Sequence, residues 1–254
     1  MAMTQYKSAL ITGASAGIGA ALATALAAPG TVLHLSARDL NRLEATAAAC
    51  RAKGATVFPR AIDVRDAAAM ADWIAAAAPL DLAVANAGIA ASGDPNATRD
   101  IFATNLDGAL NTMLPAMAAM RAQPPGADGV RGRIAVIASI AAFLAMPESP
   151  AYSASKAAID NWTVASARSA RTAGVQLTSV CPGFIRTAMT AKNTAPMPGL
   201  MTADQAAGII LRGIAAGRVR LAFPWWMATI ARLAGLLPPR VLGKLLPDPT
   251  GGHP

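Results

Sequence analysis

Two side chains near the middle of the chain, Tyr152 and Lys156, have the types and the spacing needed to move a proton. They lie four positions apart, so on a helix they would share one face. A phenol has an ordinary pKa of about 10, and a neighbouring ammonium group stabilises the phenolate and lowers that pKa. Such a pair could exchange a proton with a carbonyl or an alcohol. The alternative is a chance pair on a solvated helix face; Tyr6, the only other tyrosine, precedes the first expected strand.

A glycine-rich segment, Thr12–Gly19, could bind phosphate. Glycines allow a tight turn and a close approach of the backbone to a pyrophosphate, and a helix that follows offers free N–H groups. The same residues match the G-x-S-x-G pattern of hydrolases, which would make Ser15 a nucleophile. That mechanism needs an acid and, after it, a histidine, and the only such histidine is His253, close to the end of the chain. We therefore reject the hydrolase interpretation.

Apolar runs that alternate with amphipathic ones supply the elements that would position these residues. The expected strands are Ala9–Thr12, Thr31–Ser36, Thr56–Ile62, Asp81–Ala85, Arg133–Ala138, Val175–Val180 and Arg218–Ala222, and helical patterns cover 17–28, 39–53, 66–77, 98–121, 152–172 and 202–216. Apolar strands separated by helices predict a doubly wound, Rossmann-like α/β fold with a parallel sheet of about seven strands. We expect residues 1–222 to form one dinucleotide-binding catalytic domain, with 223–254 as its C-terminal appendage.

Taken together, the motifs resemble those of the short-chain dehydrogenase/reductase family. Thr12–Gly19 is similar to the cofactor motif of that family, and Asn86-Ala87-Gly88 to its second motif. Asp63-Val64 matches the pair that lies against adenine, and Pro182-Gly183 the segment that borders nicotinamide. The likeness covers residues 8 to about 222. One departure is Ala85, where the family often has a second asparagine.

The resemblance implies a role for each matching residue. Ser139, 13 positions before Tyr152, would bind the substrate oxygen, Tyr152 would transfer the proton, and Asn105 would position a water in a proton relay. Lys156 would hold the nicotinamide ribose. The residues that would bind the cofactor are Gly13, Ser15, Gly17, Ile18, Gly19, Arg38, Asp63, Val64, Asn86, Ala87, Gly88, Tyr152, Lys156, Pro182, Gly183, Ile185 and Thr187. A non-catalytic NADP-binding sensor or scaffold is the alternative, but all four catalytic positions are intact.

The end of the second expected strand bears on the choice of cofactor. A carboxylate there would bond the ribose 2′-hydroxyl and repel a 2′-phosphate. The place falls on Ala37, followed by Arg38, whose guanidinium suits a phosphate. We therefore expect NADP(H) in preference to NAD(H), with Ser15 as a second phosphate contact. The alternative is that Asp39 binds the ribose and Arg38 faces water.

Apolar side chains in segments that should line the substrate pocket suggest an apolar ketone or aldehyde. We expect Phe143, Met146 and Met189 to line that pocket. The resemblance also implies a mobile lid after Gly183, and a homodimer or homotetramer formed through the helices near 106–121 and 152–172.

Composition narrows the remaining classes. Hydrophobic residues make up 54% of the 254 positions and charged residues 14%, which excludes a disordered chain. Two histidines are too few for most metal sites, so we expect no metal, and Cys50 and Cys181 are expected to be buried thiols. The net charge of +8 is scattered, which argues against nucleic-acid binding. With no export signal visible, a cytoplasmic location is the default expectation.

The C-terminal appendage differs in composition from the rest of the chain. Residues 205–247 hold six basic residues and no acidic one, together with Trp225 and Trp226. Short amphipathic helices of this composition could lie on a membrane surface. The alternative is a cover over the substrate pocket or a subunit interface.

Overall fold

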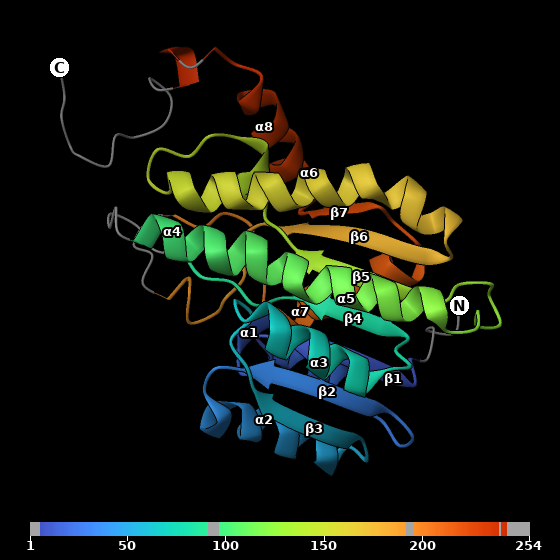
Figure 1. The fold of residues 1–254 in the computed structure, drawn as a ribbon. Helices are drawn as coiled ribbons and strands as arrows, with labels where there is room; N and C mark the ends of the chain where they lie inside the picture. Colours follow the sequence, from blue (N-terminus) through green and yellow to red (C-terminus); the bar gives the residue numbers. More distant parts are fainter. Residues whose placement is uncertain (1–5, 91–96, 192–195, 239, 243–254) are drawn as a thin grey trace.

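Seven parallel strands form one sheet in the computed structural model, which describes residues 6–90, 97–191, 196–238 and 240–242. The order across the sheet is β3-β2-β1-β4-β5-β6-β7 (Figure 1). The strands are β1 (Ser8–Thr12), β2 (Val32–Ala37), β3 (Thr56–Ala61), β4 (Leu82–Ala85), β5 (Gly132–Ile137), β6 (Val175–Pro182) and β7 (Arg220–Phe223). All seven expected strands are present, and their ends differ from expectation by at most two residues. The doubly wound α/β fold is confirmed.

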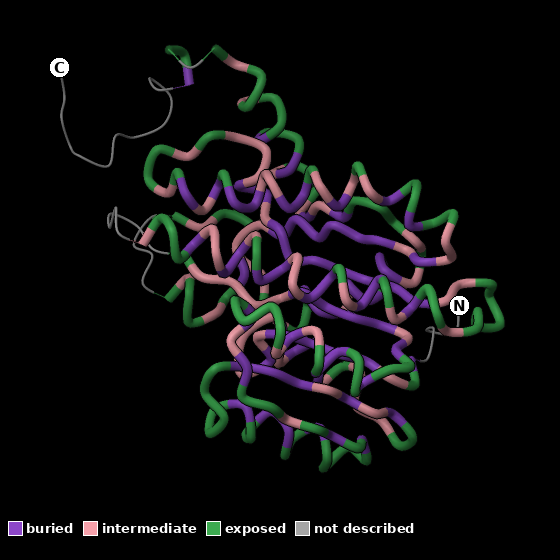
Figure 2. The backbone as a smooth tube through the Cα atoms, viewed as in Figure 1, coloured by how far each residue is buried: buried purple, intermediate pink, exposed green. Residues whose placement is uncertain are grey.

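Helices cover both faces of the sheet. On one face lie α1 (Gly17–Leu26), α2 (Leu40–Ala52) and α7 (Ala203–Ala215), and on the other α3 (Ala67–Ala77), α5 (Gly108–Ala122) and α6 (Pro150–Thr172). Strands β1, β2, β4, β5 and β6 are buried along most of their length, whereas the edge strand β3 is largely exposed (Figure 2). Alanines such as Ala47 in α2 and Ala116 in α5 are fully buried, so the helices approach the sheet closely. Both cysteines are buried and free, as expected.

The sheet order places a topological switch between β1 and β4. From β1 the chain winds outward through β2 and β3, then returns to the other side of β1 and continues through β4 to β7. At such a switch the connections after neighbouring strands diverge and leave a crevice at the carboxyl ends of the strands, where ligands of this fold class bind. The two motifs expected to bind the cofactor, after β1 and after β4, therefore meet at this crevice.

The helical pattern expected over 98–121 is confirmed, but the segment is not regular α-helix throughout. The structure has α4 (Ala97–Phe102), a π-helical turn over Ala103–Asp107, and then α5. The wider turn carries Asn105, which is 1% exposed and bonds to the backbone of Ile89 outside the helix. Those bonds to a second segment compensate for the irregular helical ladder, a contact that local periodicity does not register.

The C-terminal part continues directly from the sheet. After β7 the chain enters α8 (Trp225–Gly235), whose buried residues Ala228 and Ala231 pack against Ile140. Residues 243–254 of the expected appendage lie outside the described residues. No helix in the described part of the chain is both long and apolar enough to span a bilayer.

Candidate active site

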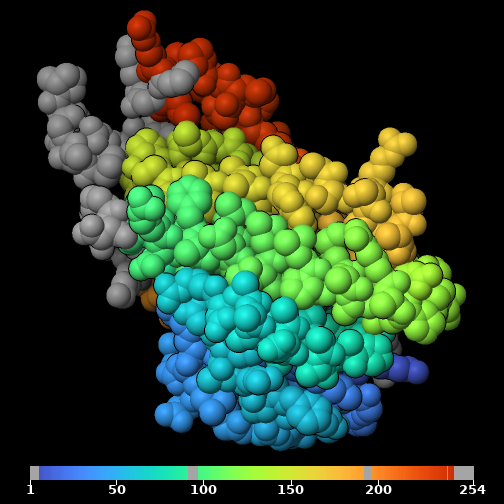
Figure 3. All heavy atoms as spheres, in the orientation of Figure 1, coloured from blue at the N-terminus to red at the C-terminus, as the bar shows by residue number. Residues whose placement is uncertain are grey.

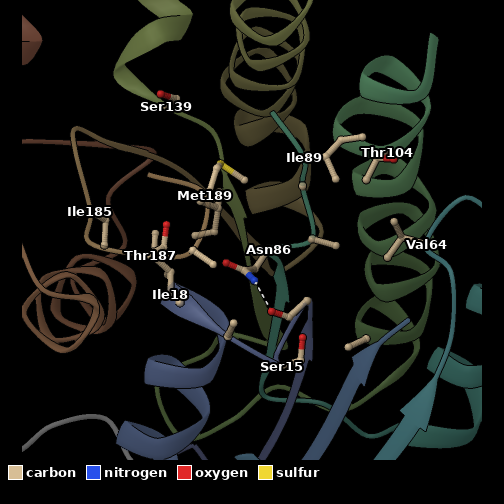
Figure 4. A pocket seen from close by; sticks show the side chains of 18 of the residues that line it. Ser15, Ile18, Val64, Asn86, Ile89, Thr104, Ser139, Ile185, Thr187 and Met189 are labelled. Atoms are coloured by element: carbon tan, nitrogen blue, oxygen red, sulfur yellow. Dashed lines mark hydrogen bonds between the residues drawn. The ribbon is translucent and has the colours of Figure 1, made fainter. Parts of the chain in front are cut away.

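A cavity of about 310 Å³ opens at the carboxyl edge of the sheet. Every strand from β1 to β6 contributes residues at or just beyond its end. The lining residues are Gly13, Ser15, Ala16, Gly17 and Ile18 after β1; Ala37, Arg38, Ile62, Asp63 and Val64 after β2 and β3; Asn86–Ile89 and Thr104; Ile137–Ser139, Tyr152 and Lys156; and Pro182, Gly183, Ile185 and Thr187–Thr190. Figure 4 shows labelled side chains entering this space from the turn after β1, from the segment after β6 and from the opposite wall. The crevice therefore brings together most of the residues expected from the sequence.

The glycine-rich turn fits a pyrophosphate. Gly13 and Gly17 have φ angles of 65° and 56°, in the left-handed region that favours glycine. A Cβ atom at Gly13 would lie 2.8 Å from the Cα atom of Ala87, so a larger residue would push the two turns apart. Ala16 precedes α1 and has no side-chain oxygen that could cap the helix. The first N–H groups of α1 thus remain available to an anion.

Gly19 acts differently from the other two glycines. It does not line the cavity, and a Cβ atom there would lie 2.5 Å from both the Gly13 oxygen and the Asn86 Nδ2 atom. Gly19 therefore lets α1 pack closely beneath the turn. It supports the shape of the site without facing it.

Thr12 and Asn86 clamp the turn after β4 to the turn after β1. The Asn86 Nδ2 atom donates to the carbonyl oxygens of Thr12 at 2.9 Å and Gly13 at 3.0 Å. The Thr12 Oγ1 atom accepts from the backbone N–H groups of Asn86 at 3.0 Å and Ala87 at 3.2 Å. The sequence analysis gave Thr12 no part in the site beyond its place in the motif. Only the pairing of β1 with β4 brings its hydroxyl to the second motif.

The catalytic candidates Ser139, Tyr152 and Lys156 lie together on one wall. Ser139 follows β5, and its Oγ atom accepts from the backbone N–H of Ala141 at 3.1 Å. Tyr152 and Lys156 share one face of α6, with the Lys156 Nζ atom 5.8 Å from the centre of the tyrosine ring. The Lys156 ammonium donates to the carbonyl oxygen of Ile137 at 2.7 Å, a partner that the sequence analysis missed.

Burial is the main cause of the shifted pKa values of Lys156 and Tyr152. It lowers the pKa of Lys156 from 10.5 to about 8. Burial also raises the pKa of Tyr152, and a hydrogen bond with Ser139 acts in the opposite direction. The net direction of the Tyr152 pKa is therefore upward, opposite to the lowering expected from Lys156 alone. The ammonium is directed to Ile137, and the loss of water around the phenol has the larger effect.

Asn105 lies next to residues that line the cavity but does not face the cavity itself. Its neighbour Thr104 does line the cavity. A Cβ atom at Gly88 would lie 3.2 Å from the Asn105 Oδ1 atom and 3.3 Å from the Lys156 Nζ atom. The backbone of Gly88 therefore passes close to both the Asn105 amide and the Lys156 ammonium.

Arg38 and Asp39, the two residues that bear on cofactor choice, face different surroundings. Arg38 lines the cavity and is exposed. Asp39 does not line it; its carboxylate caps α2 by accepting from the backbone N–H of Arg42 at 3.1 Å. Asp63 lines the cavity next to Arg38, and its hydrogen bond to Arg65 is the main cause of its lowered pKa.

The three expected substrate residues do not gather in one place. Met189 lines the cavity that holds Tyr152. Phe143 and Met146 instead line a second, separate cavity between the segment 142–147, the start of α6 and Gly235 at the end of α8. Residues 91–96, which follow Ile89 along the chain, and 192–195, which follow Thr190, lie outside the described residues.

Comparison with known proteins identifies the chain. Residues 7–198 match the family model described as short chain dehydrogenase. The chain belongs to the short-chain dehydrogenase/reductase family. It is 36% identical over 249 residues to an uncharacterized oxidoreductase of Myxococcus xanthus, covering 94% of this chain and 95% of that one.

Two further relatives agree with this assignment. A ketoacyl reductase, HetN, of Nostoc sp. is 30% identical over 224 residues, covering 82% of this chain and 75% of that one. A crystal structure of a short-chain type dehydrogenase/reductase from Mycobacterium marinum superposes with a TM-score of 0.74 at 26% identity, covering 85% of this chain and 92% of that one. The protein is thus a short-chain dehydrogenase/reductase that depends on NAD(P)(H). The glycine-rich turn, which lines the cavity, and the uncapped start of α1 fit that cofactor.

Proposed function

We propose that this short-chain dehydrogenase/reductase is an NADP-dependent oxidoreductase that interconverts a carbonyl and an alcohol, with Tyr152 exchanging the proton. The observation that carries the proposal is the convergence of Ser139, Tyr152 and Lys156 on the cavity that begins at the glycine-rich turn. Bound NADPH would supply the hydride at the carbonyl carbon. The residues of this chain would bind the oxygen and manage its proton.

Each catalytic candidate has a role that its contacts support. Ser139, anchored through the N–H of Ala141, would donate a hydrogen bond to the carbonyl oxygen. Tyr152 would give its phenolic proton to that oxygen as the hydride arrives, and recover one afterwards. Lys156 would bond the ribose and offset negative charge on the phenolate, an effect that is strong in a site shielded from water. Asn105, held behind Gly88, would position a water that returns the proton.

The preference for NADP(H) is supported by two contrasting neighbours. Arg38 lines the cavity at the end of β2, where a 2′-phosphate would lie, and a guanidinium binds phosphate in a bidentate manner. Asp39, the residue that could favour NAD(H), uses its carboxylate at the start of α2. Ser15 also lines the cavity and could make a second phosphate contact. We therefore propose the phosphorylated cofactor.

The proposed substrate is an apolar ketone or aldehyde. Ile89, Ile185 and Met189 line the same cavity as Tyr152 and offer no charge to a polar substrate. The name of the Nostoc relative, ketoacyl reductase, is consistent with a carbonyl on an apolar chain.

We further propose at least a homodimer through α5 and α6, since Leu114 on α5 is 51% exposed.

A substrate panel tests the proposal. The purified protein is mixed with NADPH, or with NADH in a parallel series, and with apolar aldehydes, ketones and β-ketoacyl thioesters. Loss of the reduced-nicotinamide absorbance is then followed. Turnover that is faster with NADPH supports the proposal. Tight NADPH binding without turnover of any compound would favour the non-catalytic sensor instead.

A further inference from the structure

Helix α8 presents apolar side chains to solvent and buries small ones. Its buried residues are two alanines, Ala228 and Ala231. Trp225 is 76% exposed, and Trp226, Ile230, Leu233 and Leu236 are exposed as well. Figure 1 places the helix at the β7 edge of the molecule, beyond α6, and Figure 3 shows its atoms at the outer surface. A cluster of large apolar side chains on one helix marks an interaction surface.

The charged residues within α8 and next to it in the sequence are all basic. From Gln205 to Pro247 the sequence contains no aspartate or glutamate. Arg232 lies within the helix and Arg240 follows it, and both are exposed. The Arg232 guanidinium lies 4.4 Å from the centre of the Phe143 ring. The partner of this surface should therefore be apolar and carry negative charge at its boundary.

A second copy of the chain fits these features poorly. A two-fold contact places the same patch on both subunits, so each copy would meet a patch in which α8 offers no carboxylate to Arg232 or Arg240. Like charges brought together at an interface oppose association. An anionic bilayer complements both features, since tryptophan favours the headgroup region and arginine is attracted to anionic lipids.

We propose that α8 binds the surface of an anionic lipid bilayer, lying in the headgroup region with Trp225, Ile230 and Leu233 inserted. With 11 residues, from Trp225 to Gly235, the helix is far too short to cross the membrane. It therefore acts as an interfacial anchor, of the kind whose affinity grows with buried apolar area and anionic lipid content.

Helix α8 contacts two segments that adjoin active-site residues, one at Gly183 and one at Phe143. A Cβ atom at Gly183, which lines the cofactor cavity, would lie 2.9 Å from the Met227 sulfur. At the other end, a Cβ atom at Gly235 would lie 2.1 Å from the Phe143 carbonyl oxygen, so the helix ends directly against the segment that follows Ser139. Gly235 also lines the second, largely apolar cavity. A bilayer at α8 would thus adjoin an apolar space next to the site, which suits a lipid-like substrate; this consequence rests on the proposed function, whereas the binding does not.

Vesicle sedimentation tests the anchor. The full-length protein is mixed with vesicles of phosphatidylcholine alone or with phosphatidylglycerol, at low and at high salt. Trp225→Glu and Leu233→Glu, each placing a carboxylate on the exposed face, are compared with Phe58→Glu. Phe58 is similarly exposed but lies on β3, at the opposite edge of the sheet. Thermal melting and NADPH titration confirm that each variant is folded.

We expect the wild type and Phe58→Glu to sediment with phosphatidylglycerol vesicles at low salt, and more weakly at high salt. Each α8 variant should bind at least about tenfold more weakly. Absence of wild-type sedimentation, or equal sedimentation of all variants, would overturn the proposal. Light scattering tests whether a second copy of the chain covers α8 instead. That would be the result if an α8 variant has a lower molecular mass in solution than the wild type while no form binds vesicles. The NADPH titration also separates this result from failure of the proposed function, since dinucleotide binding does not depend on lipid.

Discussion

Asn105 and Ile89 share two hydrogen bonds that fix the amide in one orientation. The backbone N–H of Ile89 donates to the Asn105 Oδ1 atom at 2.8 Å, and the Asn105 Nδ2 atom donates to the Ile89 carbonyl at 2.9 Å. Nδ2 also donates to the Ser155 Oγ atom at 3.2 Å, on the helix that carries Tyr152 and Lys156. One buried side chain therefore joins the segment after β4, the π-helical turn and α6.

Replacing Asn105 should weaken both stability and turnover. Asn105→Ala leaves the N–H and carbonyl of Ile89 without their partner, and a buried polar group left unpaired costs about 1–3 kcal/mol. Denaturant unfolding measures this loss. Asn161, which is exposed on α6, provides the control, since Asn161→Ala should change stability by less than about 0.5 kcal/mol. Equal stability of the two variants would contradict the bonding role of Asn105.

Removing the phenolic oxygen of Tyr152 should abolish most turnover and leave cofactor binding nearly unchanged. Loss of a positioned acid–base group lowers kcat by about 10²–10⁴-fold, and Tyr152→Phe keeps the ring. The other tyrosine supplies a matched control, because the buried Tyr6 hydroxyl has no hydrogen-bond partner among the described residues. Tyr6→Phe should retain full activity. A wild-type rate in Tyr152→Phe would rule out the proposed proton transfer.

Replacing Arg38 should weaken NADPH binding much more than NADH binding. A hydrogen bond to a charged group contributes about 1.5–3 kcal/mol, which corresponds to roughly 10- to 150-fold in Kd. Arg42→Ala is the control, since Arg42 lies nearby on α2 but does not line the cavity. Fluorescence titration of both cofactors provides the measurement. A similar loss of affinity for NADPH and NADH in Arg38→Ala would show that Arg38 does not contact the 2′-phosphate.

The buried ammonium of Lys156 should make stability depend on pH. Its pKa is lowered to about 8 in the folded chain from 10.5, so between these values the unfolded chain binds more protons. The free energy of unfolding therefore contains a contribution that rises with pH in this window. Other groups titrate there as well, so the wild type is compared with Lys156→Met without cofactor. From pH 7 to pH 9 the wild type should gain about 1 kcal/mol relative to the variant.

A pH-independent difference between these two proteins would contradict the lowered pKa. Lys53→Met serves as the control, because Lys53 is an exposed lysine at the end of α2. Urea unfolding at several pH values gives all three free energies on the same scale.

Local patterns in the sequence were sufficient for most of the fold. Strand β4 is apolar and buried along its whole length, and a buried parallel strand is recognisable as such an apolar run. The glycines of the turn after β1 were equally readable, because a left-handed φ leaves few other residues. The interrupted helix around Asn105 was not, because its cause is a bond to Ile89, 16 positions away.

The sequence by itself determined which chemical groups are present and which strand ends carry them: the Tyr152–Lys156 pair, Ser139 and the glycine-rich turn. Tertiary structure alone decided their surroundings. Burial raised the pKa of Tyr152, Ile137 became the acceptor of Lys156, and Phe143 was placed in a different cavity from Met189. It also paired Asp160 of α6 with Arg220 of β7, 60 positions later, at 2.7 Å. The physical reason is that residue types and short spacings follow from the covalent chain, whereas desolvation and long-range partners exist only once separate elements pack together.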